Sequence, residues 1–227
     1  MNITPDQIVY LRYGPFTLNA TILMTWLVMA VLVLASWLIT RNMKPDAPVT
    51  GKQGMLEMVV LMINGQIEEL GLKKPAHYIS LIGTLFLFIL ISNLSVVFPG
   101  YRPPTGSLST TAALAICVFL AVPVYNIASI GLKKYLKSYA KPNPVMIPFN
   151  IIGEVSRTLS LSFRLFGNIM SGEMIASILL TLTPFFFPVV MNLFGILTGT
   201  IQAYIFAVLA AVYIAAAGTS SSNNQDF

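Results

Sequence analysis

The sequence predicts an all-α integral membrane protein with about five transmembrane helices and an interfacial amphipathic helix. The last two transmembrane helices are expected to be long, strongly tilted and paired as a hairpin. The composition is 56% hydrophobic and only 9% charged, which is too little charge to cover a soluble domain. The final two apolar segments are about 35 residues each, or roughly 50 Å as helices, against a hydrocarbon core of roughly 30 Å.

The charged residues are separated by four long gaps. Each gap exceeds the roughly 20 residues that a helix needs to cross a bilayer. Stretches without Asp, Glu, Lys or Arg lie between Arg12 and Arg41, between Lys74 and Arg102, between Arg102 and Lys133, and between Glu173 and Asp226. The basic residues stand at the ends of these gaps, so the net charge of +5 indicates membrane orientation rather than nucleic-acid binding.

The chain divides into seven predicted parts. They are an N-terminal non-cytoplasmic segment (1–15), a first transmembrane helix (16–40), an interfacial amphipathic helix (51–74), transmembrane helices at 77–98 and 108–131, a long tilted helical hairpin (148–217) and a flexible C-terminal tail (218–227). The N-terminus has no basic region ahead of an apolar run, so we expect no cleaved signal peptide. The single Cys117 excludes a disulfide framework.

The interfacial helix is predicted from its polar residues. Gln53, Glu57, Asn64 and Glu68 are spaced 4, 7 and 4 apart, which places them on one helical face with apolar residues around the rest. A helix of this kind lies at the membrane surface. Nine basic residues follow the first and third spans and predict the cytoplasmic side: Arg41, Lys44, Lys52, Lys73, Lys74, Lys133, Lys134, Lys137 and Lys141. Five crossings then place the N-terminus outside and the C-terminus inside.

The fourth span carries a polar stripe. Its members are spaced 3, 4, 4 and 3 apart and share one helical face: Arg157, Ser160, Arg164, Asn168 and Ser171. At about 100° per residue, Glu154 lies about 80° off the stripe, and Glu173 lies on about the opposite face from Arg164. Arg164 falls near the middle of the long helix, and therefore near mid-membrane.

The hairpin predicts which residues share a depth. Arg164 lies 19 residues before Thr183, and Gln202 lies 18 after Pro184, so an antiparallel pair brings them level. Glu173 falls level with about Asn192 to Gly195. The last helix has its own small and polar stripe, which consists of Asn192, Gly195, Gly199 and Gln202. Gly195 and Gly199 form a G-x-x-x-G pair, which lets helices approach closely.

An arginine at mid-membrane needs a partner, a wet cavity or a function. Arg164 stays protonated at physiological pH, and the bilayer centre costs it several kcal/mol. Neither Glu154 nor Glu173 is well placed on its face to pair with it. We therefore expect a carboxylate from a partner subunit, whose proton release the arginine would promote. The alternatives are an internal ion pair for Arg164, and interhelical hydrogen bonding as the whole role of Asn168 and Gln202.

These motifs resemble subunit a of the F-type ATP synthase, bacterial type. The resemblance is carried by "LSLSFRLFGNIMSGEM" and "IQAYIFAVLAAVYI", with "ISNLSVVFPG" and "PFNIIGE" in support. The combination of R-L-F-G-N, a Glu five residues after that Asn, and the late Q-A-Y-I-F is specific. The resemblance covers most of the chain from about Gly51 onward.

The resemblance implies a non-catalytic stator subunit that conducts H⁺ or Na⁺ through two half-channels to and from the c-ring carboxylates. Arg164 would meet the ring carboxylate and block a short circuit between the half-channels. Asn168, Glu173 and Gln202 would line the ion path, with Glu173 toward the non-cytoplasmic side. Glu154, Ser160, Ser171 and Asn192 are further candidate contributors to this path.

The same resemblance implies the protein's surroundings. The expected partners are the c-ring proteolipid subunits, the subunit b peripheral stalk, other ATP synthase subunits and the lipid bilayer, without nucleic acid. No catalytic residue, cofactor or metal is expected. The expected location is the cell inner (plasma) membrane.

Two departures from the family pattern stand out. Many bacterial relatives place a His seven residues before the late Gln, where this chain has Gly195. His77 is the only histidine, so a Glu–His relay cannot operate in the last hairpin. The stretch from Glu154 to Arg164 is also shorter than in some relatives.

Two other classes of function compete with the rotary stator. The first is an autonomous secondary ion transporter or channel, which usually shows inverted repeats and paired broken helices; the sequence shows neither. The second is a purely structural membrane scaffold, which leaves the mid-membrane Arg164 without an explanation.

Overall fold

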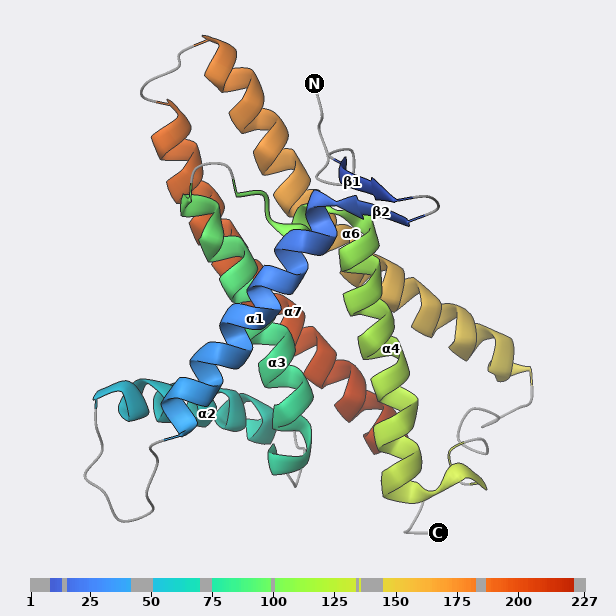
Figure 1. Ribbon diagram of the computed structural model, residues 1–227. Coiled ribbons are helices and arrows are strands. Elements are labelled where there is room, and N and C mark those ends of the chain that lie inside the picture. Colours follow the sequence, from blue (N-terminus) through green and yellow to red (C-terminus); the bar gives the residue numbers. More distant parts are fainter. Residues whose placement is uncertain are drawn as a thin grey trace.

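The computed structural model describes residues 9–13, 16–41, 51–69, 75–98, 101–133, 135, 145–182 and 187–222. Helices dominate it, and one of them, α2 (Gly51–Glu69), lies across one end of the others (Figure 1). Five stretches are long and apolar enough to cross a membrane: Ala20–Thr40, His77–Val97, Leu108–Ala128, Ile147–Thr181 and Val189–Ala216. The predicted all-α membrane fold with five spans is therefore confirmed.

A two-stranded hairpin precedes the first span. Strands β1 (Val9–Tyr13) and β2 (Phe16–Asn19) pair antiparallel, with Tyr13 opposite Phe16. Helix α1 (Ala20–Thr40) therefore begins four residues later than predicted, and the chain remains extended through Asn19. Aromatic and β-branched residues such as Phe16 and Thr17 favour strands, and pairing supplies the backbone hydrogen bonds that a helix would otherwise make.

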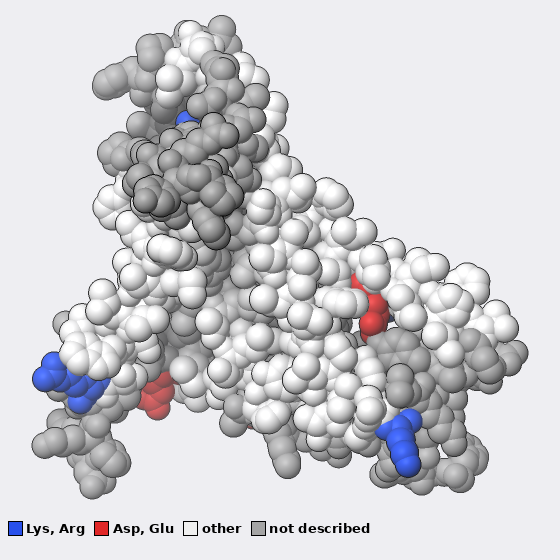
Figure 2. Space-filling model, turned by 45° about the vertical axis from the view of Figure 1, so that its right-hand side comes forward, with Lys and Arg blue, Asp and Glu red and all other residues white. Residues whose placement is uncertain are grey.

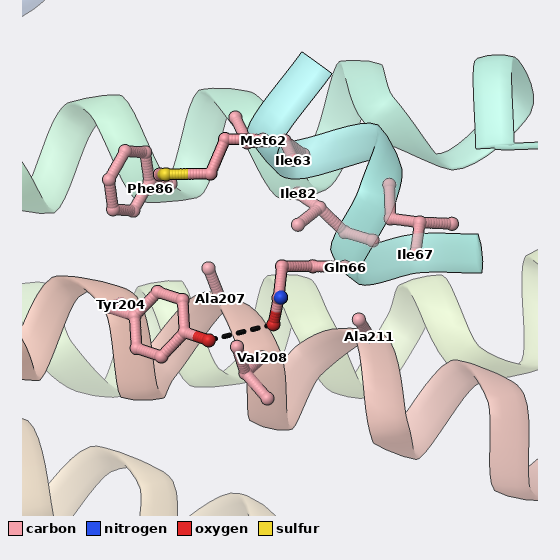
Figure 3. A pocket seen from close by; sticks show the side chains of 10 residues that line it. All are labelled: Met62, Ile63, Gln66, Ile67, Ile82, Phe86, Tyr204, Ala207, Val208 and Ala211. Atoms are coloured by element: carbon pink, nitrogen blue, oxygen red, sulfur yellow. Dashed lines mark hydrogen bonds between the residues drawn. The ribbon is translucent and has the colours of Figure 1, made fainter. Parts of the chain in front are cut away.

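The structure confirms the predicted separate helix between the first two spans, which is α2. The prediction extended this helix to residue 74, and residues 70–74 lie outside the described part. Its Ile63 and Ile67 are buried against α3 (Pro75–Leu94), while Glu57 and Glu68 are exposed. Figure 3 shows this contact, where Ile63 and Ile67 lie beside residues of α3 and α7. The side chain of Gln53 lies outside the described residues, and the location of α2 at the membrane surface stays a prediction.

Part of the connection from the second to the third span is packed inside the molecule. Helix α3 is followed by the short 3₁₀ helices η2 (Ser95–Val97) and η3 (Pro104–Gly106) and then by α4 (Leu108–Ile130). Residues 103–107 are all buried, although the sequence suggested only a turn-rich loop. Helix α4 passes through Pro123 and ends at Gly131, whose φ of 84° is the left-handed conformation that favours glycine at a helix end.

The last two helices form the predicted pair. Helix α6 (Met146–Leu182) has 37 residues and α7 (Phe187–Ser222) has 36, so each is about 55 Å long. They contact one another, α4 packs against α6, and α3 packs against α7. Both run obliquely to α4 (Figure 1). Helix α7 continues through residues 218–222, where the sequence predicted a flexible tail, and residues 223–227 lie outside the described part.

The core is apolar and small, and much of the apolar surface faces outward. Ile89, Leu165, Phe206 and Ala210 are fully buried where α3, α6 and α7 meet. Many large apolar side chains remain exposed, especially along α1. Among the described residues on the face shown in Figure 2, charged groups are few and lie apart from one another within an uncharged surface. An apolar exterior of this kind suits contact with lipid or with other membrane subunits.

Candidate functional site

The predicted polar stripe of α6 lies on an exposed face of that helix. Ser160, Arg164 and Ser171 are exposed. Leu161 and Leu165, on the other side of the helix, are buried. Within the described residues, no hydrogen bond or ion pair joins Arg164 to another side chain. The arrangement thus presents an arginine charge on the outside of the helix pair, near the middle of a candidate membrane span.

The register between α6 and α7 places Arg164 level with Gln202. Asn168 Nδ2 donates to the backbone oxygen of Thr198 over 3.4 Å. The two helices are antiparallel, so equal steps in opposite chain directions lead from this contact to the same level. Arg164 is four residues before Asn168, and Gln202 is four residues after Thr198. Gln202 is only 5% exposed, and its amide Nε2 has no hydrogen-bond partner within the described part of the chain. A buried donor without a partner costs about 1–3 kcal/mol, so this amide is available to a water or an approaching group.

A cleft between α6, α7 and the C-terminal end of α3 gathers most of the other predicted site residues. It encloses about 790 Å³, the space open at its mouth included. Asn168, Ser171, Glu173 and Asn192 all line it, together with Gly195. The cleft brings these four together and leaves Arg164, Ser160 and Glu154 outside it. An added Cβ at Gly195 would meet nothing within 4 Å, so the cleft is open at this position of α7.

Glu173 faces the buried connection between α3 and α4. It lies nine residues after Arg164, on the opposite side of α6, as the sequence predicted. A Cβ built on Gly106 would lie 3.4 Å from the Glu173 carboxylate oxygen Oε1. The carboxylate is therefore held between α6 and the segment 101–107.

Sequence reasoning missed Asn93 and Thr105 as site residues. Asn93 Nδ2 donates to the Gly199 backbone oxygen over 2.9 Å, and Thr105 Oγ1 donates to Asn93 Oδ1 over 2.7 Å. Both side chains are buried, and Asn93 lines the cleft. An asparagine inside an apolar span is itself a functional signal, so Asn93 could have been found. Thr105 could not, because nothing in a Pro-rich loop indicates burial.

Tyr101 stands at the start of that connecting segment. Burial raises the pKa of Tyr101 to about 12, although the hydroxyls of Ser95 and Ser92 beside it oppose the shift. The phenol therefore stays protonated across the physiological pH range. The phenol contributes polarity but no charge near the C-terminal end of α3.

Glu154 and Arg157 lie toward the other end of α6. Glu154 is half-buried, and Thr158 Oγ1 donates to its backbone oxygen over 2.9 Å. The guanidinium of Arg157 lies 5.8 Å from the ring centroid of Tyr213 on α7, within the range of a cation–π contact. Glu154 is ten residues, or about 15 Å of helix, from Arg164, so the two form no common cluster.

Comparison with known proteins identifies the family. The sequence model of the family described as ATP synthase A chain matches residues 22–215. The chain belongs to the ATP synthase subunit a family. It is 55% identical to ATP synthase subunit a 2 of Acaryochloris marina over 99% of this chain and 96% of that protein. It is 57% identical to ATP synthase subunit a of Albidiferax ferrireducens over 96% and 94% of the two chains. Nitrosospira multiformis has a subunit a that is 53% identical over 99% and 89%.

Membership of this family shows the general activity of the chain. Subunit a is a non-catalytic, multi-pass membrane subunit of ATP synthase, the stator subunit that conducts ions together with the c-ring. It works with other subunits of the ATP synthase.

Proposed function

We propose that ions cross this subunit by two half-channels that meet the c-ring at the exposed stripe of α6. The observation that carries the proposal is Arg164, which is exposed, has no partner among the described residues and lies level with the buried amide of Gln202. A cation in that position favours the ionised form of an arriving ring carboxylate and so promotes release of its ion. The same fixed charge opposes direct passage of a cation between the half-channels.

The cleft is proposed as the non-cytoplasmic half-channel. Glu173, Asn168 and Asn192 line it, and Ser171 stands at its edge toward the exposed stripe. Glu173 and Arg164 are separated by nine residues, about 14 Å along α6, and face opposite sides. An ion that leaves Glu173 therefore has to pass the Asn168–Thr198 contact before it reaches the arginine face. Asn168 and Ser171 belong both to the stripe and to the cleft.

The cytoplasmic half-channel is proposed at the other end of the stripe. Ser160 lies one turn before Arg164 on the exposed face, and Glu154 lies farther toward the start of α6. Arg41 and Lys133 are exposed at the ends of α1 and α4, and basic residues mark the cytoplasmic side. The N-terminus then faces outward, the C-terminus faces the cytoplasm, and the host bilayer is the plasma membrane.

The proposed partners follow from this arrangement. The c-ring proteolipids would approach the exposed face of α6, and the peripheral stalk subunit b would contact other membrane-facing surface. The carried ion is H⁺ or Na⁺. Rotation of the ring couples this flow to ATP synthesis or, in reverse, to ATP-driven pumping.

Reconstitution separates this proposal from an autonomous channel. The purified chain alone in liposomes is expected to give no ion flux above empty liposomes, because its route ends at an arginine that needs a ring carboxylate. Addition of the c-ring and the remaining membrane subunits should restore flux, measured with a pH-sensitive dye for H⁺ and with ²²Na⁺ for Na⁺. Flux through the chain alone would favour the autonomous transporter instead.

Replacement of Glu173 by glutamine tests the cleft. The amide keeps the shape of the side chain but cannot take up or release a proton, and it holds Na⁺ weakly. We expect roughly tenfold slower passive ion conduction through the membrane sector, which corresponds to about 1.4 kcal/mol of added barrier. Glu57→Gln, an exposed carboxylate on α2, is the matched control and should conduct normally. Equal conduction by both variants contradicts the role of Glu173.

A further inference from the structure

The cleft has the size of a ligand pocket, because glycines stand where side chains could fill it. Gly172 on α6 and Gly195 on α7 both line it, and an added Cβ at either position would meet nothing within 4 Å. The cleft encloses about 790 Å³ with its mouth included, and sites for small molecules enclose roughly 300–1,000 Å³. The space can therefore admit a small organic molecule as well as an ion.

The walls of the cleft combine one charge with apolar surface. Glu173 is the only charged side chain among the described residues that line the cleft, and Arg102 of the segment 101–107 is not one of them. Ile175, Met191 and Phe194 contribute apolar wall, and Phe194 is 59% exposed. A carboxylate beside an apolar and partly aromatic wall complements a cation that carries an apolar body.

The Glu173 carboxylate has a fixed backing on the side of the segment 101–107. Its Oε1 stands 3.4 Å from the position that a Cβ on Gly106 would take. Residues 103–107 are buried, and Thr105 Oγ1 donates to Asn93 Oδ1 of α3 over 2.7 Å. The negative charge thus lies against packed protein and not against a loop that can swing away. Because Glu173 is half-buried, its attraction for a cation is screened less than that of a carboxylate in open water.

We propose that the cleft binds a small organic ammonium ion, which stops ion flow by occupying the route between Glu173 and Asn168. The ammonium group would pair with the Glu173 carboxylate, and the apolar body would lie against Met191 and Phe194. A quaternary ammonium ion has no proton to pass on, so it occupies the carboxylate without being carried. The inference rests on the proposed half-channel, since a ligand in the cleft blocks flow only if the cleft is the route of the ion.

The first test uses the permanent charge of benzyltrimethylammonium, which allows this ligand to be confined to one side of inverted membrane vesicles. Loaded inside, on the non-cytoplasmic side, it should halve ATP-driven pumping at a concentration on the order of 1 mM, as expected for a ligand of this size. The same concentration added outside should leave pumping intact. Benzenesulfonate, an anion of similar size, should have no effect from either side. Inhibition from the cytoplasmic side alone, or equal inhibition by both compounds, contradicts the proposal.

The second test fills the cleft. Gly195→Val places two methyl groups in it and should raise the half-inhibitory concentration at least fivefold, with each variant compared with its own uninhibited rate. Gly65→Val is the matched control, because an added Cβ at Gly65 on α2 also meets nothing within 4 Å and Gly65 does not line the cleft. This control should keep the sensitivity of the unaltered chain. Equal sensitivity of the two variants would place the ligand elsewhere and overturn the proposal.

The third test measures binding without pumping. In a Cys117→Ala background, Ala176→Cys places a thiol in the cleft wall of the purified ATP synthase, and mass spectrometry of subunit a follows its modification by N-ethylmaleimide. Benzyltrimethylammonium should slow this modification severalfold. Glu173→Gln should raise the concentration needed for protection roughly tenfold, because it removes the charge that attracts the ligand.

The outcomes separate the ligand site from the half-channel. Protection of the thiol without any inhibition of pumping would show that the cleft binds ammonium ions but is not the route of the ion, so the half-channel would be wrong. Absence of protection overturns the ligand site, even if Glu173→Gln slows ion conduction and thereby supports the half-channel. Protection that is unchanged in Glu173→Gln would also overturn it, because the carboxylate would then play no part in binding.

Discussion

Arg164→Ala is expected to abolish ATP-driven ion pumping while the ATP synthase still assembles. The side chain is exposed, and within the described residues it has no hydrogen bond or ion pair, so its removal breaks no contact that the fold needs. It does remove the charge that promotes ion release from an arriving carboxylate. Pumping by inverted vesicles should fall to background, measured with a fluorescent pH indicator or ²²Na⁺ uptake, with normal amounts of subunit a in the purified complex.

The matched control for this variant is Arg157→Ala, seven residues earlier on the same helix. Arg157 is exposed and stacks on Tyr213, so its loss should reduce pumping by less than about twofold, in line with a surface substitution. Coupled pumping that persists in the Arg164→Ala variant would contradict the proposed mechanism. A complex that fails to assemble only with Arg164→Ala would show that the arginine is structural.

Gly199→Val is expected to have the largest effect on stability. A Cβ at Gly199 would lie 2.8 Å from Asn93 Cβ and 3.2 Å from Asn93 Cγ, so even the first added carbon forces α3 and α7 apart. Overpacking of this kind costs about 1–3 kcal/mol, and the Asn93 hydrogen bond to the Gly199 oxygen would be lost as well. We expect a lower melting temperature in detergent and less protein in the membrane.

Gly195→Val provides the control, because Gly195 is one helical turn earlier on α7 and an added Cβ there meets nothing within 4 Å. It should keep the melting temperature of the unaltered chain, although its side chain enters the cleft. If both variants melt alike, the close approach of α3 and α7 at Gly199 does not limit stability.

The main architecture was predictable from one-dimensional features of the sequence. The long charge-free stretches predict five spans, and their lengths predict that the last two helices are longer than the bilayer is thick. Both predictions need only the helical rise per residue and the thickness of the bilayer. The register of Arg164 with Gln202 was also predictable, since counting from the hairpin turn fixes depth. The position of Glu173 opposite the arginine stripe follows from 100° per residue in the same way.

Other features depended on contacts between distant segments. The start of α1 at Ala20 depends on the pairing of β2 with β1, and the helical state of residues 218–222 has no strong local signal. Gly199 was predicted to serve close helix approach, and it does so, but its neighbour is Asn93 of α3 rather than a residue of α6. Spacing on one helix identifies a face without identifying what packs against that face.

The sequence by itself determined the membrane class, the spans, the polar stripe around Arg164 and, through its motifs, the family. Only the tertiary structure decided which elements complete the cleft: Asn93 from α3, and Pro103 from the segment between α3 and α4. The physical reason is that helical periodicity is a local property of the backbone, so it can be counted along the chain. Whether a loop is buried depends on how the surrounding helices pack against one another. That packing involves residues far apart in the sequence, so no local pattern predicts it.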